Sequence, residues 1–269
     1  MPPSPRNAHP ADAAHPQEGI RPRRLALLDT DQLEAGASST PLAQATTCLL
    51  DDLAEAYRAY ERIAGVSARE LPQIDRLTLT PAGGVRWEPA AETPAEDAGP
   101  EPISPLQAIA CADALVIGYA RDAEGAADGP TALLERMAHA HSDALSPGTR
   151  VYAIGTGHAH DPHALEPSFA ALERACRARG LSWCGVVAAG GGATVARWVH
   201  TPRMGFWRRS RSEAIDRLIA AMRCGLSIAA YAERMHFRGA MARAATQNAI
   251  YSRCPLPRPL YQLAVRMIG

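Results

Sequence analysis

The chain has 269 residues, 47% of them hydrophobic, and its 28 basic and 28 acidic side chains give a formal net charge of zero. A chain of this size can bury a large core, and a zero net charge provides no overall field to collect nucleic acid or an anionic surface. All the basic side chains are arginine. Schiff-base chemistry, a pyridoxal phosphate anchor and a Walker-type phosphate loop each need lysine and are therefore excluded.

Neither a leader peptide nor a membrane-spanning segment is expected. Residues 1–20 are rich in Pro, Ala and His and lack an apolar run, which predicts a disordered tail. The six cysteines are widely spaced and form no CxxC pair, as is typical of reduced proteins. We therefore expect a cytoplasmic protein without a membrane or nucleic-acid partner.

The folded domain is expected to begin at residue 21 with a buried strand. Residues 25–28 form a short apolar run that a polar turn follows, and residues 50–60 then carry apolar side chains at helical spacing. Residues 74–80 alternate enough to predict a second strand. Residues 81–105 are crowded with Pro, Ala, Gly and Glu, which predicts a surface insertion.

Three more buried strands are expected in the second half of the domain. They are residues 114–118, 151–154 and 183–189. Residues 130–145 and 165–176 have a helical period, and Ser210 and Glu213 have capping-box spacing ahead of a last helix. This alternation predicts an α/β domain over residues 21–230, a three-layer, doubly wound fold with five parallel strands.

The remaining residues, 231–269, are expected to form a C-terminal helical extension. The segment has helical character to about Ser252, and prolines at 255, 257 and 259 then break it. We expect this extension to pack on the domain and to carry no site of its own.

In an open parallel sheet, the ligand crevice lies beyond the carboxyl ends of the strands. The loop at 29–40 brings hydroxyl groups to a helix start, where they either cap the helix or help to bind a phosphate. The loop at 119–129 carries a tyrosine that could stack on a flat ring and an arginine that could pair with an anion. The loop at 155–163 has glycines that allow a close backbone approach. The candidate cofactor-binding residues are Thr30, Asp31, Ser38, Ser39, Thr40, Tyr119, Ala120, Arg121, Gly155, Thr156, Gly157 and His158.

The third loop also contains a histidine cluster. The spacing His158-x-His160-Asp161-x-His163 resembles the HxHxDH motif of metallo-β-lactamase-like hydrolases, although the aspartate is displaced by one position. Asp161 followed by Pro162 equally predicts a helix N-cap with proline at the first helical position. We therefore assign no metal ligand, and both solvent-exposed histidines and a metal-dependent hydrolase remain open.

Residues 112–118 (ADALVIG), 129–136 (GPTALLER) and 147–157 (PGTRVYAIGTG) resemble the middle of the flavodoxin-like NAD(P)H-dependent oxidoreductases. The glycine turn at 190–192 is also similar to turns in that family, and the resemblance covers residues 104–228. It implies a five-stranded sheet of order 2-1-3-4-5 with FMN held by the three loops described above. It also implies NAD(P)H as co-substrate, a small-molecule electron acceptor and a homodimer.

Two departures from that family favour a different function. Family members usually have a Ser-Pro-x-Tyr-like turn where this chain has residues 118–121, and Asp29, Asp31 and Glu34 place negative charge beside the expected phosphate. The first hypothesis is an FMN-dependent oxidoreductase, the second is a non-enzymatic flavodoxin-like binding module that has lost FMN, and the third is the metal-dependent hydrolase. The arginine cluster at 203–211 predicts either a site for an acidic ligand or a solvated loop.

Overall fold

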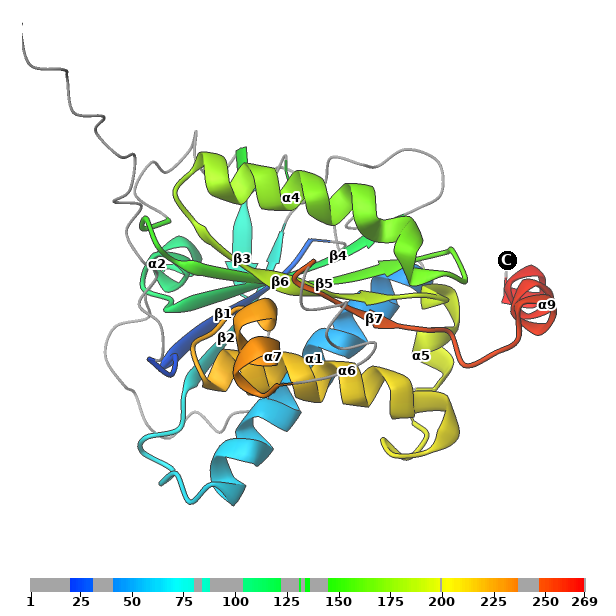
Figure 1. Ribbon diagram of the computed structural model, residues 1–269, viewed down its shortest axis with the longest axis horizontal. Helices are drawn as coiled ribbons and strands as arrows, with labels where there is room; N and C mark the ends of the chain where they lie inside the picture. Colours follow the sequence, from blue (N-terminus) through cyan, green and yellow to red (C-terminus); the bar gives the residue numbers. More distant parts are fainter. Residues whose placement is uncertain are drawn as a thin grey trace, which may run out of the picture.

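The central sheet has seven strands in the order β3-β2-β1-β4-β5-β6-β7, and helices cover both of its faces (Figure 1). The computed structural model describes residues 20–30, 41–79, 84–87, 104–121, 131, 134–135, 145–198, 200–236 and 247–268. The strands are β1 (Arg24–Asp29), β2 (Gln73–Leu79), β3 (Val85–Trp87), β4 (Ala114–Arg121), β5 (Arg150–Gly157), β6 (Ser182–Ala189) and β7 (Ala249–Ser252). The helices are α1 (Pro41–Ile63), α2 (Pro105–Ala110), η1 (Pro162–Leu165), α4 (Glu166–Ala178), η2 (Gly192–Thr194), α5 (Val195–Trp198), α6 (Phe206–Arg223), α7 (Ile228–Arg234) and α9 (Arg258–Ile268).

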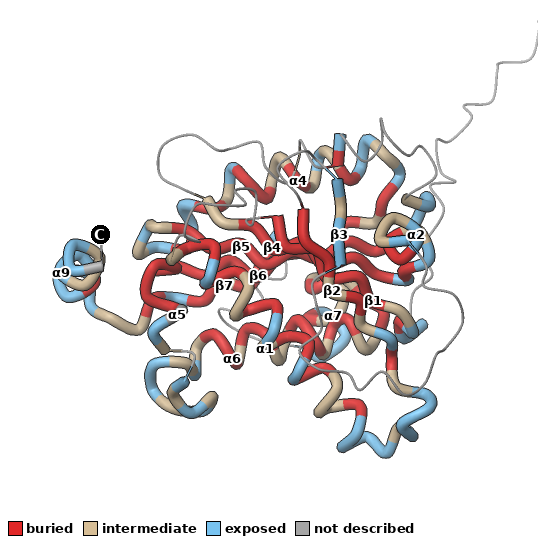
Figure 2. Tube along the Cα trace, turned by 180° about the vertical axis from the view of Figure 1, so that it is seen from behind, coloured by how far each residue is buried: buried red, intermediate tan, exposed pale blue. Residues whose placement is uncertain are grey.

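The central strands β1, β4, β5 and β6 are largely apolar because both faces of the sheet are covered there. Leu25 and Leu27 of β1 belong to the same buried cluster as Leu53 of α1, together with side chains of α6. The alternate residues Ala26 and Leu28 belong to a second cluster, which side chains of α4 complete. The layers are therefore α1 with α6, the sheet, and α4 with α2, and Figure 2 shows the sheet buried between them.

All five expected strands are present, and two further strands flank them. β3 pairs antiparallel with β2 inside the expected insertion, and β7 pairs parallel with β6 in the segment expected to be helical up to Ser252. The expected number of strands and the helical reading of residues 249–252 were therefore wrong. Strands of three and four residues are too short to show a period in the sequence.

β7 joins the sheet through an unusual connection. The chain passes from β5 to β6 through α4 on one face, and from β6 to β7 through α5, α6 and α7, which lie on the opposite face (Figure 1). Both connections move one strand along the sheet in the same direction, so in its described part the second has the opposite hand. Nearly all such crossovers are right-handed, so this connection departs from the ordinary doubly wound pattern.

The start of α6 also differs from the expectation. α6 begins at Phe206 with Gly205 as its N-cap, so Ser210 and Glu213 lie inside the helix. Glu213 accepts from Arg209 Nε at 2.8 Å instead of capping the helix. The capping-box prediction was wrong because residues three and four apart also face each other on any helix surface.

All six cysteines are free, as expected, and they differ sharply in burial. Cys111 is exposed, whereas Cys176 is buried in α4, and burial raises the pKa of the Cys176 thiol to about 12. Because the thiolate is the reactive form, Cys176 should stay unreactive at pH 8 while Cys111 reacts with a thiol reagent.

Mass-spectrometric peptide mapping after timed labelling checks this prediction. A Cys111→Ser variant should lose the fast phase and keep the slow labelling of the buried cysteines. Fast labelling of Cys176 in the folded protein would contradict the packing of α4 on the sheet.

No helix among the described residues has both the length and the apolar character needed to cross a lipid bilayer.

Candidate functional site

The carboxyl ends of β1, β4 and β5 lie side by side at one edge of the sheet. The three strands are parallel neighbours, with Leu28 opposite Ile117 and Ile117 opposite Ala153. The segments that follow them therefore leave the sheet at the same edge, as the sequence predicted. β2 lies on the far side of β1 from β4, so the strand order reverses between β1 and β4 and creates a topological switch point.

Hydroxyl groups tie these strand ends to each other and to α1. Thr30 donates from Oγ1 to the Gly118 carbonyl oxygen at 2.8 Å. The hydroxyls of Thr46 and Thr156 are 2.9 Å apart, and both residues are buried. Thr30 and Thr156, two candidate binding residues, thus use their side chains within the protein.

The glycines at the end of β5 make room for neighbouring side chains. A Cβ at Gly155 would lie 2.8 Å from the ring of Tyr119, which is only 2% exposed. A Cβ at Gly157 would lie 3.1 Å from Leu165 Cδ2. Tyr119 is therefore a core residue of β4, and its expected place in an exposed loop was wrong, as was the loop assignment of Gly155 and Gly157.

Three of the candidate residues keep exposed surface at this edge. Ala120, Arg121 and His158 are half-buried, and Arg121 donates to the Ala164 carbonyl oxygen at 3.2 Å. The candidates Asp31, Ser38, Ser39 and Thr40 lie outside the described residues.

A cavity of about 660 Å³ opens beside the end of β5. It is lined by His158, Ala159, His160, Asp161, Pro162, His163, Arg253, Arg258, Tyr261 and Gln262. Four of these residues come from the C-terminal segment, which was expected to contribute to no site. The volume is in the range of small-molecule sites, and its arginines and histidines favour an anionic ligand.

The three histidines of this cavity do not meet at one point. His160 Nε2 lies 2.7 Å from the Leu256 carbonyl oxygen, and His163 Nδ1 lies 2.7 Å from Glu166 Oε1. Asp161 caps η1 and accepts from the His163 N–H at 3.1 Å, as the alternative reading predicted. Within the described ranges, no group of three side chains could hold a metal ion, and the hydrolase hypothesis gains no support.

His163 is oriented by its neighbours in a way that suits proton transfer. Its ring stacks on Tyr251 with centroids 4.0 Å apart, and the Tyr251 hydroxyl donates to Glu166 at 3.0 Å. Hydrogen bonding from His163 lowers the pKa of Glu166, and the bond from Tyr251 acts in the same direction. A histidine oriented by an ionised carboxylate can act as a general base.

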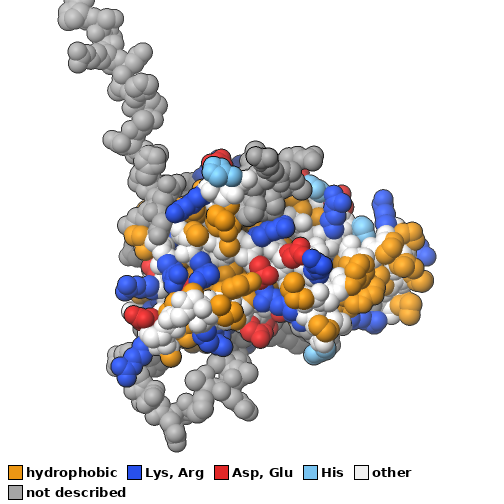
Figure 3. Space-filling model, turned by 60° about the horizontal axis from the view of Figure 1, so that its bottom comes forward, with side chains coloured by type: hydrophobic (Ala, Val, Ile, Leu, Met, Phe, Trp, Pro, Cys, Tyr) orange, Lys and Arg blue, Asp and Glu red, His pale blue; other side chains and the backbone are white. Residues whose placement is uncertain are grey.

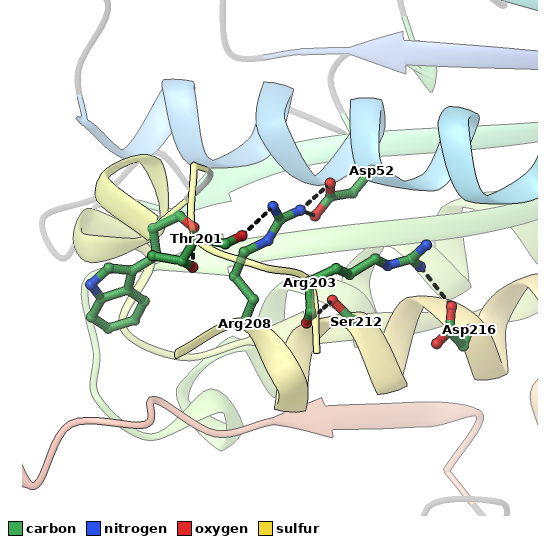
Figure 4. A network of polar contacts seen from close by, with 7 residues as sticks. Asp52, Thr201, Arg203, Arg208, Ser212 and Asp216 are labelled. Atoms are coloured by element: carbon green, nitrogen blue, oxygen red, sulfur yellow. Dashed lines mark hydrogen bonds and ion pairs between the residues drawn. The ribbon is translucent and has the colours of Figure 1, made fainter. Parts of the chain in front are cut away.

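One member of the arginine cluster, Arg208, fastens α6 to α1, as Figure 4 shows. Arg208 donates to Asp52 Oδ2 of α1 at 2.6 Å and to the Thr201 carbonyl oxygen at 3.0 Å. Arg203 donates to Asp216 at 2.6 Å. The reading of this cluster as a solvated loop was therefore wrong for these two residues.

Arg211 is the most buried member of this cluster. It donates to the Gly190 carbonyl oxygen at 3.0 Å, and its guanidinium lies 5.0 Å from the centre of the Trp198 ring. Burial lowers its pKa to about 10. Arg211 thus fixes the glycine turn after β6 against the start of α6.

Sequence reasoning missed the contribution of the C-terminal segment to this edge. The signal available was its charge, because residues 249–269 contain three arginines and no acidic side chain.

Comparison with known proteins identifies no relative, since no family model, curated protein or solved structure matches the chain. The flavodoxin-like resemblance of residues 104–228 therefore stays a prediction.

Proposed function

We propose that this chain is a flavodoxin-like oxidoreductase that binds FMN at the carboxyl edge of β1, β4 and β5. In this proposal it passes electrons from NAD(P)H to a small acceptor. The observation that carries the proposal is the switch point between β1 and β4, with parallel strands in the order β2-β1-β4-β5-β6. Ligands of open α/β sheets bind at such a point.

The start of α1 fits the phosphate of FMN. α1 is 23 residues long and has no acidic residue in its first turn, so its dipole favours an anion there. Thr30 is buried and bonded to the Gly118 carbonyl oxygen, so we assign the phosphate to residues 38–40, directly before the helix. Asp29 is buried and accepts from Thr47 at 2.6 Å, which directs its carboxylate toward α1.

The half-buried residues at the ends of β4 and β5 fit the ring side of the cofactor. Ala120, Arg121 and His158 would flank it, while Tyr119 and Gly155 act through packing beneath them. Bound flavin would supply the electron transfer, and the chain would position it and limit the access of water.

Titration of the purified protein with FMN tests this proposal. We expect bound flavin to give a visible absorption band and quenched flavin fluorescence. An Arg121→Ala variant should bind about tenfold more weakly, because a charge-assisted hydrogen bond contributes roughly 1.5 kcal/mol or more. Arg23→Ala, which removes an exposed arginine next to the amino end of β1, is the matched control and should bind normally.

The second candidate function is a binding module without FMN. The observation that favours it is the internal use of Thr30, Thr156 and Tyr119, which leaves few side chains at the edge for a flavin. A colourless protein that takes up no added FMN would support the module and end the oxidoreductase proposal.

A further inference from the structure

The last helix of the chain has an uncovered apolar face. In Figure 1, α9 lies beyond the end of the sheet and meets the rest of the protein on one side only. Leu260, Leu263 and Met267 are 53%, 56% and 71% exposed, and their spacing places them on one stripe of the helix. Of the α9 side chains whose burial is described, only that of Tyr261 is buried.

A second group of exposed apolar side chains lies at the same end of the molecule. Met204 and Phe206 are 65% and 71% exposed, and the Phe206 ring meets the Trp207 ring edge-on at 5.2 Å. The glycine turn after β6 connects this group to α9, because Arg211 holds Gly190, and a Cβ at Gly191 would lie 3.3 Å from the Tyr261 ring. Figure 3 shows hydrophobic and arginine side chains gathered at the end of the molecule where α9 lies.

The charge of these two segments has a single sign. Residues 195–209 and 253–268 together contain seven arginines and no acidic residue. Three of the seven pair with carboxylates of α1 or α6. The four that form no ion pair with any described residue are Arg197, Arg253, Arg258 and Arg266. Among the described residues, the apolar surface is therefore bordered by arginines that no carboxylate pairs.

We propose that α9 and residues 204–207 form a docking face for an anionic lipid bilayer. The apolar stripe of α9 enters the boundary between headgroups and acyl chains, and the arginines lie at the level of the lipid phosphates. Phe206 and Trp207 suit the same depth, because aromatic side chains concentrate at the membrane–water interface. The expectation of no membrane partner rested on the zero net charge and on the lack of a spanning segment, and neither excludes a local patch of this kind.

Charge also decides between a bilayer and a second copy of the chain. An isologous dimer brings the same surface of both copies together, so the arginines would face one another with no carboxylate in either segment to pair them. An anionic bilayer supplies the missing negative charge.

This proposal is independent of the proposed cofactor. α9 also lines the cavity beside β5 through Arg258, Tyr261 and Gln262. Docking would hold that cavity close to the bilayer surface. If the oxidoreductase proposal is correct, its acceptor would then be an apolar molecule dissolved in the membrane.

Co-sedimentation of the full-length chain with vesicles tests the docking face. We expect binding to vesicles of phosphatidylcholine mixed with phosphatidylglycerol, little binding to phosphatidylcholine alone, and weaker binding at high salt. Leu263→Glu with Met267→Glu should lower vesicle affinity by about tenfold or more, because both side chains leave the apolar layer. Ile63→Glu is the matched control, since Ile63 is 82% exposed and lies at the other end of the molecule, at the end of α1.

A second variant tests the electrostatic part of the proposal without touching the apolar stripe. Arg258→Gln with Arg266→Gln should weaken binding by about fivefold per charge, whereas Arg62→Gln at the end of α1 should not. Equal binding to both kinds of vesicle, or binding to neither, would overturn the proposal. A dimer that the Leu263→Glu and Met267→Glu changes dissociate would assign the face to a second copy and overturn it as well.

Discussion

Replacing Tyr119 by alanine should lower the free energy of unfolding by about 3–5 kcal/mol, as expected for removing a large buried aromatic side chain. The ring is almost fully buried and fills the space that Gly155 leaves on the neighbouring strand. Because water cannot fill an apolar gap favourably, the loss includes a cavity term. Chemical denaturation of the wild type and the variant measures the difference.

Two further variants separate this packing role from a role in stacking on a ligand. Tyr119→Phe keeps the ring and should cost about 1 kcal/mol or less. Gly155→Val should be destabilising alone, since its Cβ would meet the Tyr119 ring at 2.8 Å. The double variant Tyr119→Ala with Gly155→Val should lose less than the sum of the two, because the valine fills part of the gap. A Tyr119→Ala variant of normal stability that fails to bind FMN would show instead that the ring contacts the cofactor.

The pair Tyr119 and Gly155 also shows where the sequence stops being informative. Residues 114–117 are apolar without interruption, and such runs predict strands that are buried on both faces. The last three residues of β4 are instead tyrosine, alanine and arginine, and the last three of β5 are glycine, threonine and glycine. These residues resemble a loop until the register places Tyr119 opposite Gly155. The sequence therefore predicts the strands but places their ends too early.

The site was predicted to the extent that it depends on strand order. That β1, β4 and β5 end at one edge follows from the alternation of strands and helices, and the structure has this arrangement. The wall formed by Arg253 and Tyr261 could not be predicted in the same way, because β7 brings it there through a long-range pairing with β6. A four-residue strand at the end of an unusual crossover leaves no periodic signal.

The glycine turn after β6 packs against both ends of this surface. Gly191 has a positive φ of 68° and contacts Cys254 and Tyr261, while Gly192 lies against Leu42 at the start of α1. The proposed phosphate site and α9 are thus connected through one turn of three glycines.

The second large effect is expected near the amino ends of the strands, where Glu61→Ala should lower the free energy of unfolding by about 3 kcal/mol. Glu61 is fully buried and bonds to Arg21 and Arg223, each at 2.7 Å. It therefore joins the segment before β1 to the end of α6. Removing the carboxylate leaves two arginines without their partner, and the loss stays moderate because Arg21 is 45% exposed and can turn to water.

The matched control is Glu173→Gln, which removes an ion pair between Glu173 and Arg177 on the surface of α4. This change should cost less than about 0.5 kcal/mol, since an exposed pair one helical turn apart contributes little. Denaturant titration of both variants gives the comparison. Because Glu61 lies far from the carboxyl edge, Glu61→Ala should leave FMN and vesicle binding unchanged wherever the protein is still folded. Equal losses of stability in the two variants would show that Glu61 is not a structural clamp.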